Sequence, residues 1–265
     1  GEMFTIETLH QPQTLSEVKQ LVEKFPDITI LGGCGFLKLS SRKIPVALDL
    51  SRCELDRIRE TEQQIEIGAM VTLRDIEKNP ALNQWFDGAL PKAVSHILGV
   101  QFRSCATIGA SVYSKYGFSD ILPALLALEC QVELLRGGLM PLEEFLGKPI
   151  SRDVLIRISI TKDKRRVSYQ NLRNAGADFP MLNAAVSRHG SDWKVIVGAR
   201  PARAEIAVQA SRLLSDMAAD SIDIDKVAAT AAAELTFGSN NKASADYRRA
   251  MCQVLVKRAI GEVLA

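Results

Sequence analysis

The sequence predicts an α+β protein built in two parts. The first part mixes short β-branched runs, glycine turns and amphipathic helices, and it starts with a strand, a glycine turn and a second strand. Near residue 165 the composition shifts to a pair of strands followed by three alanine-rich helical stretches. Because no repeat, low-complexity tract or long linker separates the two parts, we expect them to pack together.

The first helix is marked at both ends. Thr14 followed by Glu17 is a capping box, and Pro26 ends the helix. The apolar side chains between them fall on one face at helical spacing: Leu15, Val18, Leu21, Val22 and Phe25. A strand, "DITIL", then runs into the glycine stretch "LGGCGF", and a second buried strand, "PVALDL", follows a short basic loop.

Alternation and capping predict the other elements of the first part. "QIEIGA" alternates like a strand, and Thr72 with Asp75 marks the start of the short helix "LRDIEKN". Further on we expect a helix over 85–98, then a glycine-interrupted strand region and a polar loop before a helix over 120–128. Strands are expected over 130–134 and 153–160. The basic run "KDKRR" after the last strand is interpreted as a solvated turn.

The second part begins at Val167. "VSYQNLRN" predicts a strand, and "FPMLNAAVSRHGSDWKVIVGA" predicts a strand pair joined by a turn over 189–192. The last of three helices, over 244–264, is expected to bury one stripe made of Tyr247, Met251, Val254, Leu255 and Val263.

Composition and charge narrow the function classes. The chain has 265 residues, 47% hydrophobic and 24% charged, with 33 Lys and Arg against 31 Asp and Glu. This balance is typical of a globular protein and gives no reason to expect a nucleic acid as partner. No apolar run reaches the ~18 residues of a membrane span, and the N-terminus is too acidic for a signal peptide. The sequence therefore predicts a cytoplasmic protein with no membrane partner.

The reactive side chains form no recognisable catalytic or metal-binding pattern. The five cysteines are far apart and the three histidines share no ligand-like spacing, so neither a disulfide framework nor a bound metal is predicted. Ser111, Ser114 and Ser119 lack a neighbouring His or a G-x-S-x-G elbow, which argues against a hydrolase. Any iron–sulfur or molybdenum centre would have to lie on a partner chain.

Two glycine- and hydroxyl-rich segments, 32–36 and 107–119, are the candidate binding elements. Glycines let main-chain amides approach a diphosphate closely, although a plain turn explains glycines alone equally well. The first segment lacks the G-x-G-x-x-G spacing of a Rossmann fold.

Five segments in order resemble one known family: "ILGGCGFLK", "IEIGAMVTLRDI", "GVQFRSCATIGASV", "SDILPALLALECQVEL" and "LEEFLGKPI". On these segments the sequence resembles the FAD-binding subunit, or flavin domain, of the molybdenum hydroxylases, the group that includes xanthine dehydrogenase and aerobic-type carbon monoxide dehydrogenase. The resemblance implies an FAD-binding domain of the vanillyl-alcohol-oxidase (PCMH) fold type over residues 3–165, in two subdomains dividing near residue 52. It implies a smaller α/β C-terminal flavoprotein domain over residues 166–265, with "VIVGARPARAEIA" and "SADYRRAMCQVLVKRAI" as signatures.

The resemblance also implies a cofactor site. The first segment would wrap the FAD pyrophosphate with its amides, and the second would add hydroxyl and carboxylate contacts to the diphosphate and ribityl regions. The FAD-binding residues implied in this way are Leu31, Gly32, Gly33, Cys34, Gly35, Phe36, Ile97, Leu98, Thr107, Gly109, Ala110, Ser111, Ser114, Asp120, Leu155 and Asp178. Among them, Ile97, Leu98 and Asp178 would lie near the isoalloxazine ring and Leu155 near the adenine. Asp120 is equally the expected N-cap of its helix.

Several positions depart from the family pattern. Cys34 replaces a threonine, Gly35 replaces a polar or acidic residue, and "GAS" at 109–111 replaces "GGN". Gln170 and Asn171 stand where a lysine is often found. Each lost hydrogen bond costs about 0.5 to 1.5 kcal/mol, so the departures are expected to weaken FAD binding.

The resemblance implies an FAD-dependent, xanthine dehydrogenase-like oxidoreductase subunit. Electrons would leave a substrate on a molybdopterin subunit, pass through a [2Fe–2S] subunit, reach FAD on this chain and go to NAD⁺ or another acceptor. Two alternatives stay open. One is a structural or assembly subunit that has lost tight FAD binding, and the other is a free-standing FAD-dependent reductase.

Overall fold

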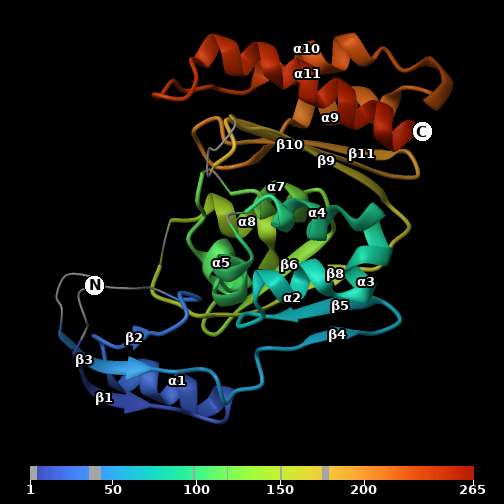
Figure 1. Cartoon of the computed structure of the whole chain (residues 1–265). Helices are drawn as coiled ribbons and strands as arrows, with labels where there is room; N and C mark the ends of the chain where they lie inside the picture. Colours follow the sequence, from blue (N-terminus) through green and yellow to red (C-terminus); the bar gives the residue numbers. More distant parts are fainter. Residues whose placement is uncertain (1–4, 36–42, 98, 118, 150, 175–178) are drawn as a thin grey trace. The chain divides into compact units, whose positions relative to one another are not determined.

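The computed structural model describes residues 5–35, 43–97, 99–117, 119–149, 151–174 and 179–265 (Figure 1). The predicted site residues Phe36, Leu98 and Asp178 lie outside these ranges. In the described part of the chain, no helix is long and apolar enough to cross a membrane.

The chain forms two compact units, each assembled from separate stretches of sequence. The first unit comprises Gly1–Leu73, Gln101–Ser114 and Cys130–Ile160. The second comprises Arg74–Val100, Lys115–Glu129 and Thr161–Ala265. The second glycine-bearing segment therefore passes from one unit into the other between Ser114 and Lys115.

A small parallel sheet opens the first unit. Its strand order is β1 (Thr5–His10), β3 (Lys43–Leu48), β2 (Thr29–Ile30), and helix α1 (Leu15–Lys24) lies between β1 and β2 in the chain. The predicted cap is confirmed, because Thr14 Oγ1 accepts a hydrogen bond from the Glu17 amide at 3.2 Å. The predicted strand, glycine turn and strand are also present, with β2 leading directly into residues 31–35.

A second sheet completes the first unit. Its strands, in spatial order, are β4 (Ile58–Glu60), β5 (Gln64–Gly68), β8 (Leu155–Thr161), β6 (Cys130–Leu134) and β7 (Gly138–Pro141). Short helices α5 (Val100–Cys105), α6 (Ile108–Tyr113) and α8 (Leu142–Gly147) connect or follow them. The strands predicted from "QIEIGA", from 130–134 and from 153–160 are confirmed.

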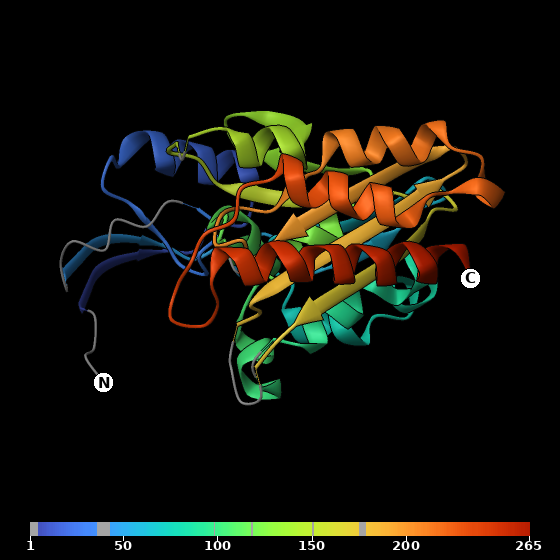
Figure 2. The same cartoon turned by 90° about the horizontal axis from the view of Figure 1, so that it is seen from above.

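The second unit contains an antiparallel sheet with the C-terminal helices packed on one face. The strand order is β12 (Glu205–Ile206), β11 (Asp192–Gly198), β10 (Leu182–His189), β9 (Arg166–Leu172). Helices α9 (Val208–Asp216) and α11 (Ala245–Leu264) contact the sheet, and α10 (Ile224–Glu234) packs against both helices, as Figure 2 shows. The predicted strand pair, its turn at 189–192 and the three helices are confirmed.

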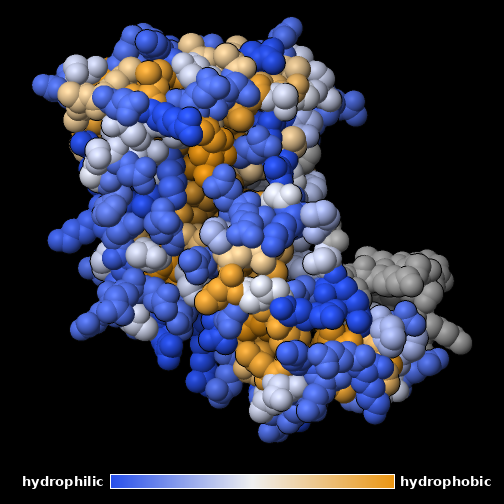
Figure 3. All heavy atoms as spheres, turned by 180° about the vertical axis from the view of Figure 1, so that it is seen from behind, coloured by the Kyte–Doolittle hydropathy of each residue, from blue (hydrophilic) through white to orange (hydrophobic). Residues whose placement is uncertain are grey.

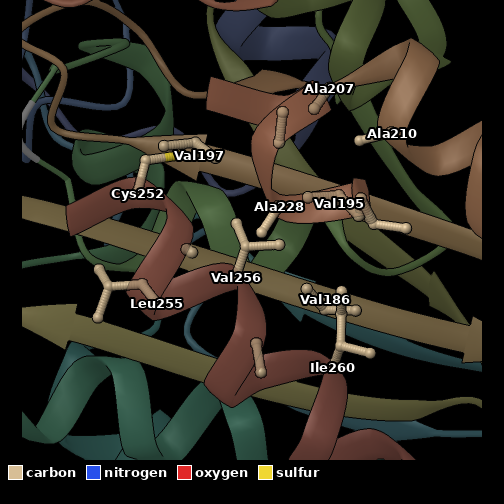
Figure 4. Packing of buried hydrophobic residues seen from close by; sticks show 14 of the residues in the cluster. Val186, Val195, Val197, Ala207, Ala210, Ala228, Cys252, Leu255, Val256 and Ile260 are labelled. Atoms are coloured by element: carbon tan, nitrogen blue, oxygen red, sulfur yellow. The ribbon is translucent and has the colours of Figure 1, made fainter. Parts of the chain in front are cut away.

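The core of this unit is made of small and β-branched side chains (Figure 4). Val186, Val195 and Val197 of the sheet face Leu255, Val256 and Ile260 of α11, with alanines of α9 and α10 between them. All of these valines and the α11 residues are fully buried. Alanine lets helix and sheet backbones approach closely, which explains the alanine-rich composition of the C-terminal helices.

The predicted stripe of α11 is partly wrong. Leu255 and Val263 are buried, but Tyr247 is 46% exposed, and Arg248 and Cys252 are buried in its place. The guanidinium of Arg248 donates to the carbonyl oxygens of Met181, Gly238 and Ala243 and to Asn240 Oδ1. A charged residue with several acceptors can occupy a buried position that hydropathy assigns to an apolar side chain.

The single helix predicted over 85–98 is also wrong. The chain instead forms α3 (Pro80–Gln84), a 3₁₀ turn η1 (Trp85–Gly88) and α4 (Ala89–Ser95). Phe86 and Asp87 have φ of 57° and 56°, which no α-helix accommodates. The Asp87 carboxylate accepts hydrogen bonds from the Val167 amide and from Arg166 Nε, so tertiary contacts override the helical pattern here.

The basic run at 162–166 is not simply a solvated turn. The Arg165 side chain is 1% exposed and pairs with Asp163 at 3.0 Å, while it also donates to the carbonyl oxygen of Ala127.

The surface seen in Figure 3 is mostly hydrophilic, with apolar groups between the hydrophilic ones. The other described elements are α2 (Leu73–Lys78), α7 (Ile121–Leu126) and η2 (Ala219–Ser221).

Candidate functional site

The first glycine segment is a sharp turn that only glycine accommodates. Gly32 and Gly33 have φ of +96° and +74°. A Cβ placed on Gly32 would lie 2.9 Å from Met70 Cε, and one on Gly33 would lie 2.9 Å from Ala110 Cβ. Gly32 is exposed and Gly33 is partly exposed, so an outside ligand can reach this backbone. A turn of this kind provides the close main-chain approach that a diphosphate requires.

The end of the same segment is fixed to β8. The Leu155 amide donates to the Cys34 carbonyl oxygen at 2.7 Å, and Gly35 forms a bridge with Val154. The Cys34 side chain is fully buried, and burial raises the pKa of its thiol to about 12. Cys34 is therefore closed to a ligand, and the accessible backbone of this segment lies at residues 31–33. The sequence placed Leu155 near the adenine, and the structure places it beside the glycine turn, fully buried.

Residues 108–113 form helix α6, so the glycine-interrupted strand and loop expected in this stretch are wrong. Thr107 is the N-cap, with its Oγ1 accepting a hydrogen bond from the Ala110 amide at 3.1 Å. The sequence gives no clear sign of this cap, because a glycine and two small residues follow at 109–111, a composition typical of loops. Six residues of helix now occupy the stretch that was expected to be open backbone.

Thr107 also joins the two segments. Its hydroxyl donates to the Gly32 carbonyl oxygen at 2.9 Å, across 75 positions of sequence. The Gly109 amide donates to the Ala69 carbonyl oxygen at 2.9 Å, and a Cβ on Gly109 would lie 2.6 Å from Cys34 Cβ. The two glycine segments that the sequence singled out are therefore in contact within one unit.

The hydroxyls of the second segment are already engaged in α6. Ser111 Oγ donates to the Thr107 carbonyl oxygen at 3.1 Å, and Ser114 Oγ donates to the Ser111 carbonyl oxygen at 3.2 Å. Each serine hydroxyl can still accept hydrogen bonds through its lone pairs, but its single proton is already donated within α6. A phosphate at this place would receive hydrogen bonds chiefly from main-chain amides, because phosphate oxygens need donors.

Asp120 and Ile97 lie in the second unit. Asp120 is 4% exposed and precedes α7, but its side chain does not cap that helix. Ser119 Oγ caps α7 by accepting from the Leu122 amide at 3.1 Å. Asp120 thus stands at the expected N-cap position, but the serine one position earlier makes the capping hydrogen bond. Ile97 is half-buried after α4.

The Asp120 carboxylate is bound from β9 and the residues after it. Tyr169 donates its hydroxyl to Asp120 Oδ1 at 2.6 Å, and Arg173 Nη2 lies 2.5 Å from Asp120 Oδ2. Burial raises the pKa of Asp120, and hydrogen bonding from Tyr169 and the charge of Arg173 oppose that rise. Burial and the neighbouring carboxylate raise the pKa of Tyr169 well above its usual value, so the tyrosine stays protonated and donates.

His96 borders this cluster. Its ring centroid lies 6.3 Å from that of Tyr169. Burial, followed by the positive charge of Arg173, lowers the pKa of His96, and Asp120 partly offsets this. The sequence interpretation did not identify Tyr169, Arg173 or Asn183, although a polar residue inside the apolar run "MLNAAV" was an available signal.

An aromatic pair lies next to two of the predicted positions. Tyr116, between Ser114 and Asp120, and Phe179, directly after Asp178, meet edge-to-face with ring centroids 5.7 Å apart. Lys242 Nζ lies 5.0 Å from the Phe179 ring centroid. This contact joins Tyr116 of the second segment to Phe179 within the second unit.

The described residues offer no group of three or more His, Cys, Asp and Glu side chains that could hold a metal ion. They do fit the diphosphate of a nucleotide at the Gly32–Gly33 turn, where two consecutive residues of positive φ leave main chain accessible from outside. Main-chain groups, and not side chains, would bind the diphosphate here, because the Cys34 side chain is buried and the Ala110 methyl group packs against Gly33.

Comparisons with known proteins agree with this geometry. Residues 3–160 match the FAD binding domain in molybdopterin dehydrogenase, and residues 167–263 match the CO dehydrogenase flavoprotein C-terminal domain. The chain belongs to this flavoprotein family. The expected resemblance and the two-domain FAD-binding fold are confirmed, and FAD is the cofactor of the matched domain.

Relatives of the flavoprotein include named subunits of larger enzymes. The nicotine 6-hydroxylase medium subunit of Paenarthrobacter nicotinovorans is 23% identical over 95% of each chain. The nicotinate dehydrogenase FAD-subunit of Eubacterium barkeri is 32% identical over 46% of this chain and 44% of that protein. A chain of the reconstituted CO dehydrogenase from Oligotropha carboxidovorans superposes with a TM-score of 0.84 at 21% identity, covering 99% of this chain and 98% of that chain. At that identity the superposition shows the fold alone.

Proposed function

We propose that this flavoprotein is the FAD-binding electron-transfer subunit of a xanthine dehydrogenase-like molybdenum hydroxylase. Its partners would be a molybdopterin-binding subunit and a [2Fe–2S] subunit, and a cytoplasmic location is part of the proposal. The domain matches and the subunit names of the relatives support it. When bound, FAD supplies the redox chemistry, taking electrons from the iron–sulfur centres and passing them to NAD⁺ or another acceptor.

The observation that carries the proposal is the contact between the two glycine segments at Thr107 and Gly32. We propose that the main chain of residues 31–35 and the start of α6 hold the FAD diphosphate. Gly32 and Gly33, with φ of +96° and +74°, turn the main chain there, while Thr107 holds the turn against α6. The remaining proposed cofactor residues are Phe36, Ile97, Leu98, Gly109, Ala110, Ser111, Ser114, Asp120, Leu155 and Asp178.

The domain boundaries are part of the same proposal. An FAD-binding domain over residues 3–165, dividing near residue 52, would be followed by a C-terminal flavoprotein domain over residues 166–265. The ranges of the two matched domains support this division.

The proposal is tested by purifying the chain and titrating it with FAD. A bound flavin gives two visible absorbance bands, and these should bleach when the partner subunits and their substrate are added. Failure to take up FAD in the titration contradicts the proposal, and uptake without bleaching in the assembled complex contradicts its electron-transfer part.

A second candidate is favoured by a specific contact. Because the Ala110 methyl group packs against Gly33 and the Cys34 thiol is buried, this chain offers fewer donors than the family pattern implies. A structural or assembly subunit with weak FAD binding would follow. Ala110→Gly, which restores the family glycine, distinguishes the two: it should strengthen FAD binding measurably if Ala110 limits affinity, and leave it unchanged if the wild-type site is complete.

A further inference from the structure

Asp120 is held by the sheet of the C-terminal part of the chain. Both of its carboxylate oxygens are used, Oδ1 by the Tyr169 hydroxyl and Oδ2 by the Arg173 guanidinium. Tyr169 is fully buried in β9, and Arg173 follows the end of that strand. Asp120 itself is 4% exposed, so its carboxylate points into this cluster and not into solvent.

Ser119 is bound from the neighbouring strand. Asn183 Nδ2, in β10, donates to the Ser119 carbonyl oxygen at 2.8 Å, and it lies 3.4 Å from Tyr169 Oη. Asn183 is fully buried near the start of β10, where its neighbours in the strand, residues 182 and 184–186, are apolar. The side-chain amide therefore links the backbone of the second segment to the same tyrosine that binds Asp120.

A third contact involves the residues after β11. The Ala199 amide donates to the Gly117 carbonyl oxygen at 3.1 Å, and a Cβ on Gly117 would lie 3.3 Å from the Ala202 backbone. Residues 117, 119 and 120 are thus each attached to a different part of the sequence beyond residue 165. All of these contacts lie within the second unit.

Stability alone gives little reason for this arrangement. Burying a carboxylate, a guanidinium, a phenol and an amide together costs desolvation free energy, and well-packed apolar residues often serve as well or better. Such a cluster does fix the position of the backbone attached to it, because hydrogen bonds are directional.

We propose that Tyr169, Arg173 and Asn183 are positioning residues that hold the end of the second FAD-binding segment, at Ser119 and Asp120, from the sheet β9–β10. The inference rests on the proposed function, and it gives the C-terminal flavoprotein domain a role in cofactor binding. The Asp120 carboxylate acts as the attachment point of the segment.

The test uses the full-length chain with four variants. Tyr169→Phe removes one hydroxyl and keeps the ring, and Asp120→Asn keeps the shape and the Oδ1 acceptor. Asp120→Ala removes both acceptors. Tyr247→Phe is the matched control, because this half-exposed tyrosine of α11 lies outside the cluster.

Amide hydrogen exchange of the FAD-free chain is the first measurement. Tyr169→Phe and Asp120→Ala should speed exchange about tenfold in residues 119–124 and leave α11 unchanged. Tyr247→Phe should behave like the wild type. Unchanged exchange in 119–124, or an equal increase throughout the chain, would overturn the inference.

The FAD dissociation constant and the visible spectrum of bound FAD are the second measurement. Tyr169→Phe and Asp120→Ala should weaken FAD about tenfold and shift its visible bands, with Asp120→Asn restoring most of the affinity. Faster local exchange with unchanged FAD affinity and spectrum would show a merely structural cluster and overturn the positioning role. If the wild type takes up no FAD, the proposed function fails, and the exchange measurement still decides whether the sheet holds the segment.

Discussion

The hydroxyl of Thr107 donates to the carbonyl oxygen of Gly32 at 2.9 Å while accepting from the amide of Ala110. One side chain therefore caps α6 and holds the first glycine turn against it. The two segments are otherwise far apart in sequence, so this contact determines the geometry of the proposed diphosphate site.

Thr107→Val tests the two hydrogen bonds of the Thr107 hydroxyl while it keeps the shape of the side chain. Valine is close in volume but has neither donor nor acceptor, so the variant loses the cap and the link to Gly32. We expect unfolding free energy to fall by about 1–3 kcal/mol and FAD affinity to fall with it. Urea unfolding and FAD titration measure the two effects. Thr107→Ser keeps the hydroxyl and should stay close to wild type in both, and a valine variant that binds FAD normally would contradict the assignment.

Gly33→Ala tests the tightness of the turn. Gly33 has φ of +74°, and an added Cβ would lie 2.9 Å from Ala110 Cβ. Gly138 is the matched control in the same unit, because it has φ of +71° and nothing within 4 Å of an added Cβ. Both alanine variants pay the left-handed strain of about 1–2 kcal/mol, but only Gly33→Ala adds the steric clash. Thermal unfolding should show a larger loss for Gly33→Ala, and equal losses would contradict the described packing.

Cysteine labelling tests burial at the first segment. Cys105 is exposed, whereas Cys34, Cys130 and Cys252 are buried. Burial raises the pKa of the Cys34 and Cys252 thiols to about 12, so hardly any thiolate exists at pH 8. A thiol reagent at pH 8 should modify Cys105 quickly and these two cysteines only after unfolding, as mass spectrometry of the labelled peptides would show. Rapid labelling of Cys34 in the folded protein would refute the account of its side chain.

His96 should contribute to the pH dependence of stability. Burial and the charge of Arg173 lower its pKa from 6.5 in the folded chain, so the folded state disfavours the protonated imidazole. The contribution of His96 is therefore fully present above pH 6.5 and is lost as the pH falls through the lowered pKa. His96→Gln should flatten the decline of unfolding free energy below pH 6.5, measured by urea unfolding at several pH values. A variant with the same slope as wild type would show that His96 does not cause the decline.

The strands and long helices were predictable because local signals and tertiary packing agree there. Ser244 accepts from the Tyr247 amide at 3.1 Å and begins α11 where the sequence placed it. The face of α11 was not predictable in full, because Arg248 is buried by carbonyl acceptors that the sequence does not reveal. Phe86 and Asp87 broke the helix expected over 85–98 for a similar reason, since their backbone conformation depends on contacts with β9.

In the candidate site too, some features were predictable from the sequence and others depend on tertiary contacts. The glycines of the first segment were identified from sequence because their composition and order are distinctive. The helix at 108–113 was not predictable, since a six-residue helix leaves no clear periodicity. The partners of Asp120 could not be identified, because Tyr169 and Arg173 are about 50 positions away in the chain.

Equilibrium titration of the purified chain with FAD, followed by the quenching of flavin fluorescence, tests the central claim most directly. The account predicts saturable binding at an equimolar ratio, weakened by Thr107→Val and retained by Thr107→Ser. A wild-type chain that leaves the fluorescence of added FAD unchanged at every concentration would contradict it.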